Sequence, residues 1–141
     1  MDFKLELVLI PVSDVDRAKA FYMEKAGFDL EVDTPVGEGQ RVVQLTPPGS
    51  ACSIAVGIGI TDAEPGSTRG THLVVTDIEA ARAELVERGV DVGEIRHFAS
   101  GTWNPGPDPE HHDYNSFADF SDPDGNTWLL QERRADAATT S

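Results

Sequence analysis

The sequence predicts an α+β protein built from two tandem modules, each made of one strand, one helix and three further strands. An internal repeat is the first observation, because Val12-Ser13-Asp14 returns 63 residues later as Val75-Thr76-Asp77. The second observation is that each copy follows a segment expected to be a strand and precedes a segment with helical periodicity. Since repeats at a fixed spacing mark duplicated structural units, we expect modules at residues 3–57 and 70–132, joined by a linker at 58–69.

The first module opens with a strand over residues 3–12, where apolar and polar side chains alternate at first and both faces are apolar from Leu7 onward. Ser13 is the expected N-cap of the helix, and Asp16 three residues later completes a capping box. The helix is expected to end at Gly27. Its predicted buried stripe consists of Val15, Ala18, Phe21 and Tyr22.

Three strands follow in the first module, at residues 28–34, 41–46 and 52–56. The first two flank a turn at Gly37-Glu38-Gly39, and Pro47-Pro48-Gly49 turns the chain into the third. Cys52, at the start of this third strand, is expected to be a small buried hydrophobic residue.

The second module repeats this order after a segment rich in glycine, proline and polar residues, which is typical of a linker. A strand is expected over residues 71–75, and Thr76 with Glu79 forms a second capping box. The helix is expected to end at Gly89. Its predicted buried stripe consists of Ile78, Ala81 and Leu85.

The last three strands are expected at residues 90–97, 116–121 and 126–132. A proline-rich loop over residues 98–115 separates the first two of them. Because loops of this length in a compact domain are usually functional or disordered, we expect a mobile lid that becomes ordered when a ligand binds. Residues 133–141 are small and polar and predict a flexible tail.

Composition excludes several classes of protein. A net charge of -14 opposes the binding of phosphate groups, so nucleic acid is not an expected partner. No apolar run approaches the roughly 20 residues that span a bilayer, and no signal peptide is evident, so no membrane association is expected. Cys52 is the only cysteine of the 141 residues, which rules out an internal disulfide and favours a cytoplasmic location.

The closing turn of the second module has the form F-x-D-P-D-G-N, over residues 120–126. Together with the duplicated modules, it resembles the vicinal oxygen chelate superfamily, which contains glyoxalases, bleomycin-resistance proteins and dioxygenases. The resemblance covers about residues 3–132 and implies that the two modules form a shared cup-shaped sheet. This fold hosts isomerases, lyases, dioxygenases, thiol transferases and non-catalytic drug binders, so the function must be argued from the site.

The resemblance also implies where metal ligands would lie. Metal-using members carry His or Gln on the first strand of each module and Glu or His on the last strand, around a divalent ion. The matching positions in this chain hold Leu7, Gly70 and Leu129, and residues 52–56 offer no carboxylate or imidazole. The resemblance therefore implies a member that lacks the metal ligands and needs no cofactor.

Three histidines leave alternatives open. His72 lies two residues beyond Gly70 and so faces the same side of its strand. It could be a hydrogen-bonding group in a mostly apolar pocket, or it could form a different metal site with Gln131 and a loop histidine. His111 and His112 could be surface or lid residues, ligand contacts or metal ligands.

Trp103 and Tyr114 are large aromatic residues in a polar loop. Such residues cover apolar surface, which here could belong to the core or to a ligand. The residues expected to contact a ligand in the cup are Leu7, Leu9, Gly70, His72, Trp103, His112, Tyr114, Phe120, Leu129 and Gln131.

Two functions compete at this point. The first is a metal-independent protein of the bleomycin-resistance type, usually a homodimer, that binds an apolar or aromatic small molecule. The alternative is a glyoxalase-like lyase or isomerase, or a dioxygenase-related enzyme, with His72, His111 or Tyr114 as the acid–base group. A purely structural module is disfavoured, because no exposed interaction stripe is evident. The missing metal ligands favour the binding protein.

Overall fold

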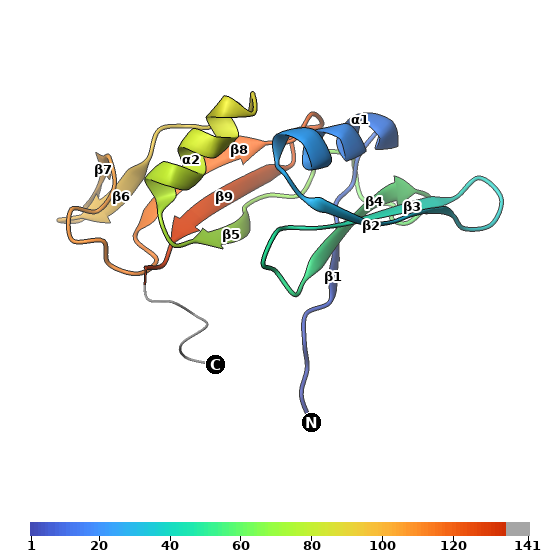
Figure 1. Ribbon diagram of the computed structural model, residues 1–141, viewed down its shortest axis with the longest axis horizontal. Coiled ribbons are helices and arrows are strands. Elements are labelled where there is room, and N and C mark those ends of the chain that lie inside the picture. Colours follow the sequence, from blue (N-terminus) through green and yellow to red (C-terminus); the bar gives the residue numbers. More distant parts are fainter. Residues whose placement is uncertain (135–141) are drawn as a thin grey trace. The chain divides into compact units, whose positions relative to one another are not determined.

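The computed structural model describes residues 1–134 and confirms the α+β class, with nine strands, two α-helices and one π-helical turn in this range (Figure 1). The expected tail beyond Arg134 lies outside the described residues. Clustering of contacts gives two compact units. Unit 1 comprises Met1–Thr68 and Asp122–Asn126, and unit 2 comprises Arg69–Ser121 and the described residues from Thr127 onward.

The sheet of unit 1 has four strands in the order β1-β4-β3-β2. These strands are β1 (Leu7–Leu9), β2 (Asp29–Pro35), β3 (Arg41–Thr46) and β4 (Ser53–Ile58). β1 pairs with β4 in parallel, and the other neighbours are antiparallel. β1 is shorter than the strand expected over residues 3–12, because only its three residues are in register with β4.

The helix of unit 1 begins one residue later than expected. α1 (Val15–Ala20) runs directly into the π-helical turn η1 (Phe21–Lys25). Its N-cap is Asp14, whose carboxylate accepts a hydrogen bond of 3.1 Å from the backbone nitrogen three residues on. The prediction that Ser13 caps this helix is wrong, because its backbone nitrogen and hydroxyl donate instead to Asp124, at 3.2 and 2.5 Å.

The helical segment of unit 1 buries the expected apolar stripe against its sheet. Val15, Ala18, Phe21 and Tyr22 are all buried, as are Val43, Leu45, Ile54 and Val56 of β3 and β4. Gly27 follows the helical segment with a φ of 78°, which suits a residue without a Cβ. These features of the first helix are therefore as the sequence predicts.

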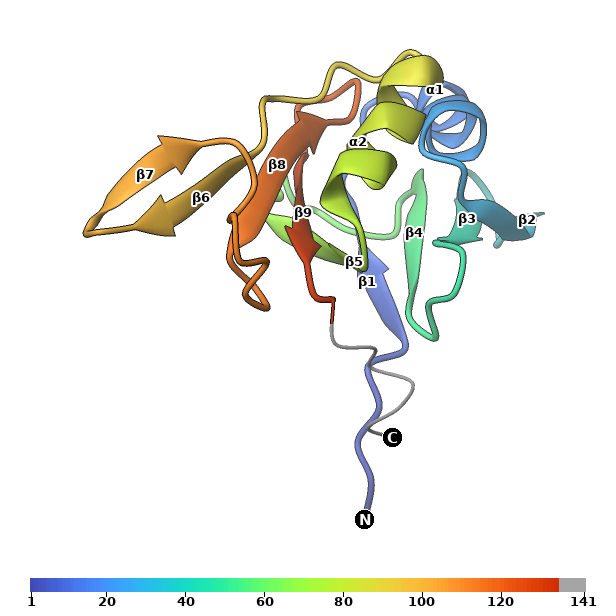
Figure 2. The same ribbon diagram turned by 60° about the vertical axis from the view of Figure 1, so that its left-hand side comes forward.

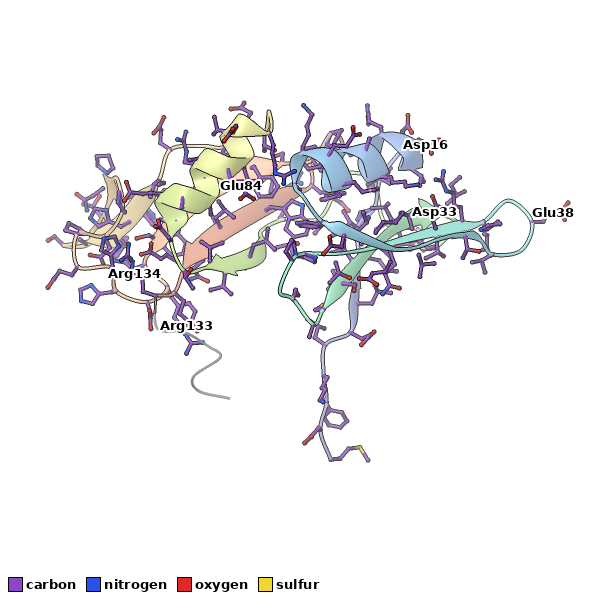
Figure 3. All side chains as sticks on the ribbon, viewed as in Figure 1. Asp16, Asp33, Glu38, Glu84, Arg133 and Arg134 are labelled. Atoms are coloured by element: carbon purple, nitrogen blue, oxygen red, sulfur yellow. The ribbon has the colours of Figure 1, made fainter. Side chains whose placement is uncertain are left out.

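Four charged side chains join the helix of unit 1 to its strands. Arg41 on β3 forms two hydrogen bonds of 2.9 Å with the carboxylate of Asp33 on β2. Its other amino group lies 2.8 Å from a carboxylate oxygen of Asp16 on α1, and Lys19 lies 2.7 Å from Asp33. Figure 3 labels the two carboxylates, Asp16 and Asp33. Hydrogen bonds from Arg41 and then from Lys19 hold the pKa of Asp33 well below its usual range.

The sheet of unit 2 has five strands in the order β5-β9-β8-β6-β7. Its elements are β5 (Thr71–Val75), α2 (Ile78–Glu87), β6 (Arg96–Ala99), β7 (Thr102–Pro105), β8 (Ser116–Ser121) and β9 (Thr127–Glu132). β5 pairs with β9 in parallel, and α2 lies over β8 and β9 (Figure 1). Figure 2 shows the β6–β7 hairpin extending away from the other strands of this unit.

α2 repeats the capping arrangement of α1. The prediction of Thr76 as N-cap is wrong, because the cap is Asp77, whose carboxylate accepts a hydrogen bond of 3.1 Å from the nitrogen of Ala80. Asp77 has the extended backbone of an N-cap, so the helix begins at the next residue. Gly89 follows the helix with a φ of 93°, as expected for its end.

The second module contains a strand that the sequence analysis does not predict. The segment expected as one strand over residues 90–97 belongs to no strand until β6 begins at Arg96, and the expected loop over residues 98–115 contains the rest of β6 and all of β7. Ser100 and Gly101 connect these strands with φ values of 55° and 78°. Two left-handed residues are what a two-residue hairpin turn of type I′ requires, so this module has one strand more than predicted.

No helix among residues 1–134 is long and apolar enough to cross a membrane. Cys52 is half-buried rather than fully buried, and its thiol lies 3.6 Å from the carbonyl oxygen of Ser53. It immediately precedes β4, where the chain leaves the turn and enters the sheet.

Candidate functional site

The sheet of unit 2 has two faces of different character. One face, the helix face, lies against α2 and is buried; it carries Ser116, Ala118, Phe120, Trp128, Leu130 and Glu132. The other, the open face, is reached by solvent; strand register places on it His72, Val74, Arg96, Phe117, Asp119, Leu129 and Gln131. The one helix among the described residues of this unit, α2, packs on the helix face, so the open face has no helical cover from that part of the unit.

Three aromatic rings form a patch at the β6–β7 end of the open face, which we call the aromatic platform. Phe98 and Trp103 are cross-strand partners whose ring centres lie 5.4 Å apart at an interplanar angle of 76°. Trp103 also meets Phe117 edge-to-face, at 5.5 Å and 78°. Phe98 and Trp103 are 47% and 52% exposed, which is unusual for rings of this size.

Two charged side chains border the aromatic platform. The guanidinium carbon of Arg96 lies 5.2 Å from the ring centre of Trp103, which is cation–π geometry. Arg96 is also paired with the carboxylate of Asp119 on the neighbouring strand. The platform therefore combines apolar rings with one positive and one negative group along its edge.

The expected contact residues Leu129, His72 and Gln131 do come together on the open face. Leu129 is in register with His72 on one side and with Asp119 on the other. Nδ1 of His72 lies 2.5 Å from the carbonyl oxygen of Gly70, two residues earlier in the chain. An apolar side chain therefore stands between the imidazole and the carboxylate of this row.

Gly70 is placed by the strand beside it. Its backbone nitrogen donates a hydrogen bond of 2.7 Å to the hydroxyl of Thr127, and its φ is 72°. A Cβ added at Gly70 would meet no heavy atom within 4 Å apart from its chain neighbours, so the space beside this position is open.

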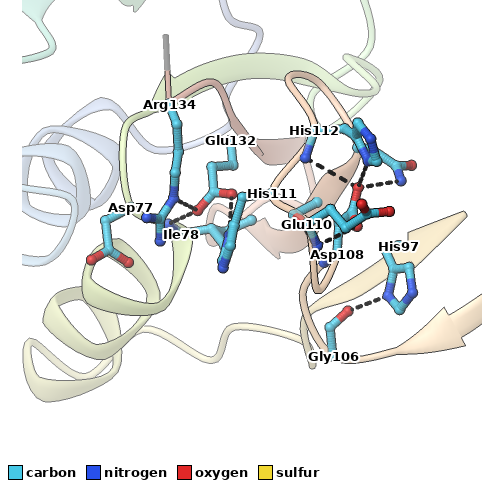
Figure 4. Close-up of polar contacts among 12 residues, drawn as sticks. Asp77, Ile78, His97, Gly106, Asp108, Glu110, His111, His112, Glu132 and Arg134 are labelled. Carbon is cyan, nitrogen blue, oxygen red and sulfur yellow. Dashed lines mark hydrogen bonds and ion pairs between the residues drawn. The ribbon is translucent and has the colours of Figure 1, made fainter. Parts of the chain in front are cut away.

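His111 lies on the side of the helix face. Its Nδ1 lies 3.0 Å from Oε1 of Glu132, a carboxylate that is 1% exposed (Figure 4). The other oxygen of Glu132 accepts a hydrogen bond of 3.0 Å from the nitrogen of Ile78. His72 occupies the opposite face, so the structure does not bring His111 together with His72 and Gln131 as a metal site.

His112 is held by a second buried carboxylate. Its Nδ1 lies 2.7 Å from Oδ2 of Asp108, which is almost completely buried (Figure 4). The hydrogen bond to Asp108 raises the pKa of His112, whereas hydrogen bonds from Asn115 and from the Glu110 backbone hold the pKa of Asp108 well below its usual range. His112 is therefore a partner of Asp108 in the loop, not of the residues on the open face.

Tyr114 sits beside the end of β9 with a left-handed backbone, at a φ of 65°. Its nitrogen donates to the carbonyl oxygen of Glu132 at 2.8 Å, and its own carbonyl accepts from the side chain of Gln131 at 3.3 Å. The guanidinium of Arg133 lies 5.6 Å from the ring centre, and half of the residue is exposed. Tyr114 is thus tied to the open face through Gln131.

Three other expected contact residues lie elsewhere. Phe120 departs from the prediction: it is 3% exposed on the helix face, and its ring stacks with that of Trp128 at 6.1 Å. The reason is that the chain alternates along β8 and places Phe117, not Phe120, on the open face. Leu7 and Leu9 belong to the edge strand of unit 1, where both are partly exposed.

The sequence analysis does not predict four residues of the aromatic platform and its border, namely Arg96, Phe98, Phe117 and Asp119. The available signal was the dipeptide Ser100-Gly101, which commonly closes a hairpin and here places Phe98 opposite Trp103. The expectation of a lid loop over residues 98–115 does not include this pairing.

Residues 1–134 do not gather the donors of a metal site. Among residues 1–134 no group of three or more His, Cys, Asp or Glu side chains is placed to hold a metal ion. On β9, the position where the family resemblance implies a metal ligand holds Leu129, whose side chain cannot donate a lone pair. The open face therefore offers rings and single polar groups rather than a ligand set.

Comparison with known proteins identifies relatives over nearly the whole chain. The structure superposes on TnmS3, an antibiotic binding protein from Streptomyces sp. CB03234, with a TM-score of 0.73 and 37% identity over 93% of this chain and 96% of that one. A glyoxalase/bleomycin resistance protein from the same organism gives a TM-score of 0.70 and 38% identity over 91% and 99% of the two chains. The uncharacterized protein YetH of Bacillus subtilis (strain 168) is 25% identical over 89% of this chain and 94% of its own.

A family model matches residues 4–130. It includes the repeated motif, the aromatic platform and the closing turn of the second module. The chain therefore belongs to the Glyoxalase/Bleomycin resistance protein/Dioxygenase superfamily.

Proposed function

We propose that this protein binds a flat, apolar or aromatic small molecule on the aromatic platform, without the help of a metal ion. The observation that carries the proposal is the exposed edge-to-face packing of Trp103 between Phe98 and Phe117. Binding a flat ligand costs these half-exposed rings little conformational entropy, because their packing against one another is already formed.

The polar groups near the platform supply orientation. Binding sites for small molecules are mostly apolar with a few polar groups that select the pose. Arg96 and Asp119 lie at the edge of the platform, and His72, Gln131 and Tyr114 provide further polar atoms along the same sheet. A ligand with an aromatic body and hydrogen-bonding substituents fits this distribution.

The relatives support the same class of ligand. TnmS3 is described as an antibiotic binding protein, and this chain shares 37% of its residues over nearly its full length. A flat aromatic antibiotic is therefore the first ligand class to test. The lyase or isomerase alternative has less support, because His72 and His111 lie on opposite faces of the sheet of unit 2.

The test measures affinity for two probes, Nile red as a neutral flat aromatic molecule and bleomycin as an antibiotic. We expect at least one to bind, and Trp103→Ala to weaken that binding about tenfold or more, because stacking on one aromatic ring contributes roughly 1–3 kcal/mol. Phe3→Ala is the matched control, since Phe3 is an exposed aromatic residue of unit 1. Equal affinity of the Trp103 variant and the wild type would overturn the proposal.

We further propose that the protein is a homodimer in the cytoplasm. Members of this superfamily of similar length are commonly dimeric, and two-fold symmetry is the commonest symmetry of soluble oligomers. Light scattering at micromolar concentration is expected to give about twice the chain mass of 15.2 kDa. A monomer mass at that concentration would count against the dimer.

A further inference from the structure

We propose that Asp108 and Asn115 are positioning residues that hold the aromatic platform in its binding shape, and that the proton on His112 tunes this hold. Ligand affinity is then linked to pH. The inference rests on the proposed function of the platform, but the contacts that carry it are present without a ligand.

The first contact is a two-point clamp on Phe98. Oδ1 of Asn115 accepts a hydrogen bond of 3.1 Å from the nitrogen of Phe98, and Nδ2 of Asn115 donates one of 2.9 Å to the carbonyl oxygen of Phe98. β8 pairs with β6 only as far as Ser116 and His97. The side-chain amide of Asn115 therefore takes over where the backbone ladder stops, and it fixes the residue that carries one platform ring.

The second contact orients the clamp. Nδ2 of Asn115 also donates a hydrogen bond of 3.1 Å to Oδ2 of Asp108. Because two acceptors surround this nitrogen, the amide cannot turn over without losing both bonds. Asp108 is itself fixed, since its Oδ1 accepts from the nitrogen of Glu110 at 3.0 Å and its own nitrogen donates to the hydroxyl of Ser116 at 2.9 Å.

The third contact brings a proton into the network. The Oδ2 atom of Asp108 that accepts the hydrogen bond from Asn115 also accepts one of 3.1 Å from the backbone nitrogen of His112. The ring Nδ1 of His112 lies 2.7 Å from the same oxygen. A charged imidazole strengthens this cluster, because an ion pair and a hydrogen bond then act on the same oxygen. The chain of contacts from His112 through Asp108 and Asn115 ends at Phe98.

Backbone geometry makes the loop depend on these contacts. His111 and Tyr114, which flank His112 closely, have φ values of 51° and 65°, a region that residues with a side chain seldom occupy. Such conformations persist when surrounding contacts hold them in place. Weakening one polar contact therefore allows the segment that carries Asn115 to relax.

The direction of the pH effect follows from the charges around His112. Asp108 and Glu110 surround it on its own loop, while Glu132 and Arg133 at the end of β9 contact the neighbouring loop residues His111 and Tyr114. The carboxylate of Asp108 raises the pKa of His112. A raised pKa means that the charged pair contributes fully at acidic pH, and that its contribution is lost as the pH rises through the folded pKa.

The first test needs no ligand. We expect the backbone amide resonance of Phe98 and the indole resonance of Trp103 to move between about pH 5 and pH 9 with the same midpoint as the ring of His112. In His112→Gln this movement is expected to vanish, and in the control His111→Gln it is expected to remain. A wild-type Phe98 amide that stays still while the His112 ring titrates would overturn the inference.

The second test measures Nile red binding over the same pH range. We expect the wild-type affinity to fall about threefold from the acidic to the alkaline end, as suits one partly exposed ion pair. His112→Gln removes this pH dependence, and Asn115→Ala weakens binding at every pH. Resonances that move together without binding of either Nile red or bleomycin would overturn the proposed function alone, whereas ligand binding without that movement would overturn this inference alone.

Discussion

Nδ1 of His111 lies 3.0 Å from one carboxylate oxygen of Glu132, and the other oxygen accepts a hydrogen bond of 3.0 Å from the backbone nitrogen of Ile78. One buried side chain thereby joins the end of β9, the start of α2 and the loop that carries His111 (Figure 4). It also places negative charge at the N-terminus of a helix, where charge of this sign is favourable. Glu132 thus organises the helix side of unit 2.

Replacing this carboxylate tests its structural role. Glu132→Ala leaves the nitrogen of Ile78 without its buried acceptor, and we expect the free energy of unfolding to fall by about 2 kcal/mol. Urea denaturation measures the loss. Glu87→Ala, at the exposed last residue of α2, is the control and is expected to cost far less. A similar loss in both variants would contradict this role.

The carboxylate of Asp33 predicts how stability depends on pH. Arg41 and Lys19 depress its pKa, so its contribution is present above about pH 4, where an unfolded aspartate ionises, and is lost as the pH falls through the folded pKa. Asp33→Asn is therefore expected to lower the urea midpoint at pH 7, and its difference from the wild type should narrow at about pH 2–3.

Asp29→Asn provides the control for this measurement. Asp29 lies on the same strand and is exposed like Asp33, but it lacks the two cationic partners. Its substitution should leave the urea midpoint nearly unchanged at both pH values. If the difference between wild type and Asp33→Asn stays constant with pH, the ion pairs do not supply this stability.

The two faces of the sheet in unit 2 predict opposite effects of two similar substitutions. Phe120→Ala empties a buried site against Trp128 and is expected to cost about 3–5 kcal/mol in the free energy of unfolding. Phe98→Ala removes a half-exposed ring and is expected to cost less than about 1 kcal/mol, because surface substitutions seldom cost more. We expect Phe98→Ala to weaken ligand binding more than Phe120→Ala does. Equilibrium binding to the folded variants measures this difference.

The donor groups of this chain predict that a divalent metal is not needed for stability. With Leu129 at the position that follows the closing turn, we expect elemental analysis to find no stoichiometric metal, and EDTA to leave the melting temperature unchanged. Melting curves with Ni²⁺, Zn²⁺, Mn²⁺ and Fe²⁺ extend the test. About one metal ion per chain in the wild type, absent from His72→Ala, would instead support the alternative function as an enzyme.

Much of the fold could be predicted because its signals are local. Gly27 and Gly89 end the two helices with left-handed backbones, and the strand beginning at Thr71 has the predicted bounds. The caps were each predicted one residue early, because Ser13 and Asp14 are equally good caps by type. The choice depends on Asp124, which lies far away in the sequence and engages Ser13.

The site was harder to predict because it depends on partners from distant segments. His111 could not be assigned to a face of the sheet from the sequence, because its position depends on a hydrogen bond with Glu132, 21 residues away. Nothing in the sequence around Asn115 indicates that its amide clamps Phe98. Only the turn at Ser100-Gly101 carried a local signal, and the prolines that follow it favoured a loop.

Residues Asp122–Asn126 of the closing turn belong to unit 1, although β8 and β9 on either side of them belong to unit 2. Within unit 1 its side chains form hydrogen bonds with four residues of the first module, namely Pro11, Ser13, Arg17 and Tyr22. Domains usually fold in the order in which the ribosome releases them. Here the amino-terminal unit lacks five residues until Asn126 has been synthesised, so its completion during translation must wait for the carboxy-terminal half.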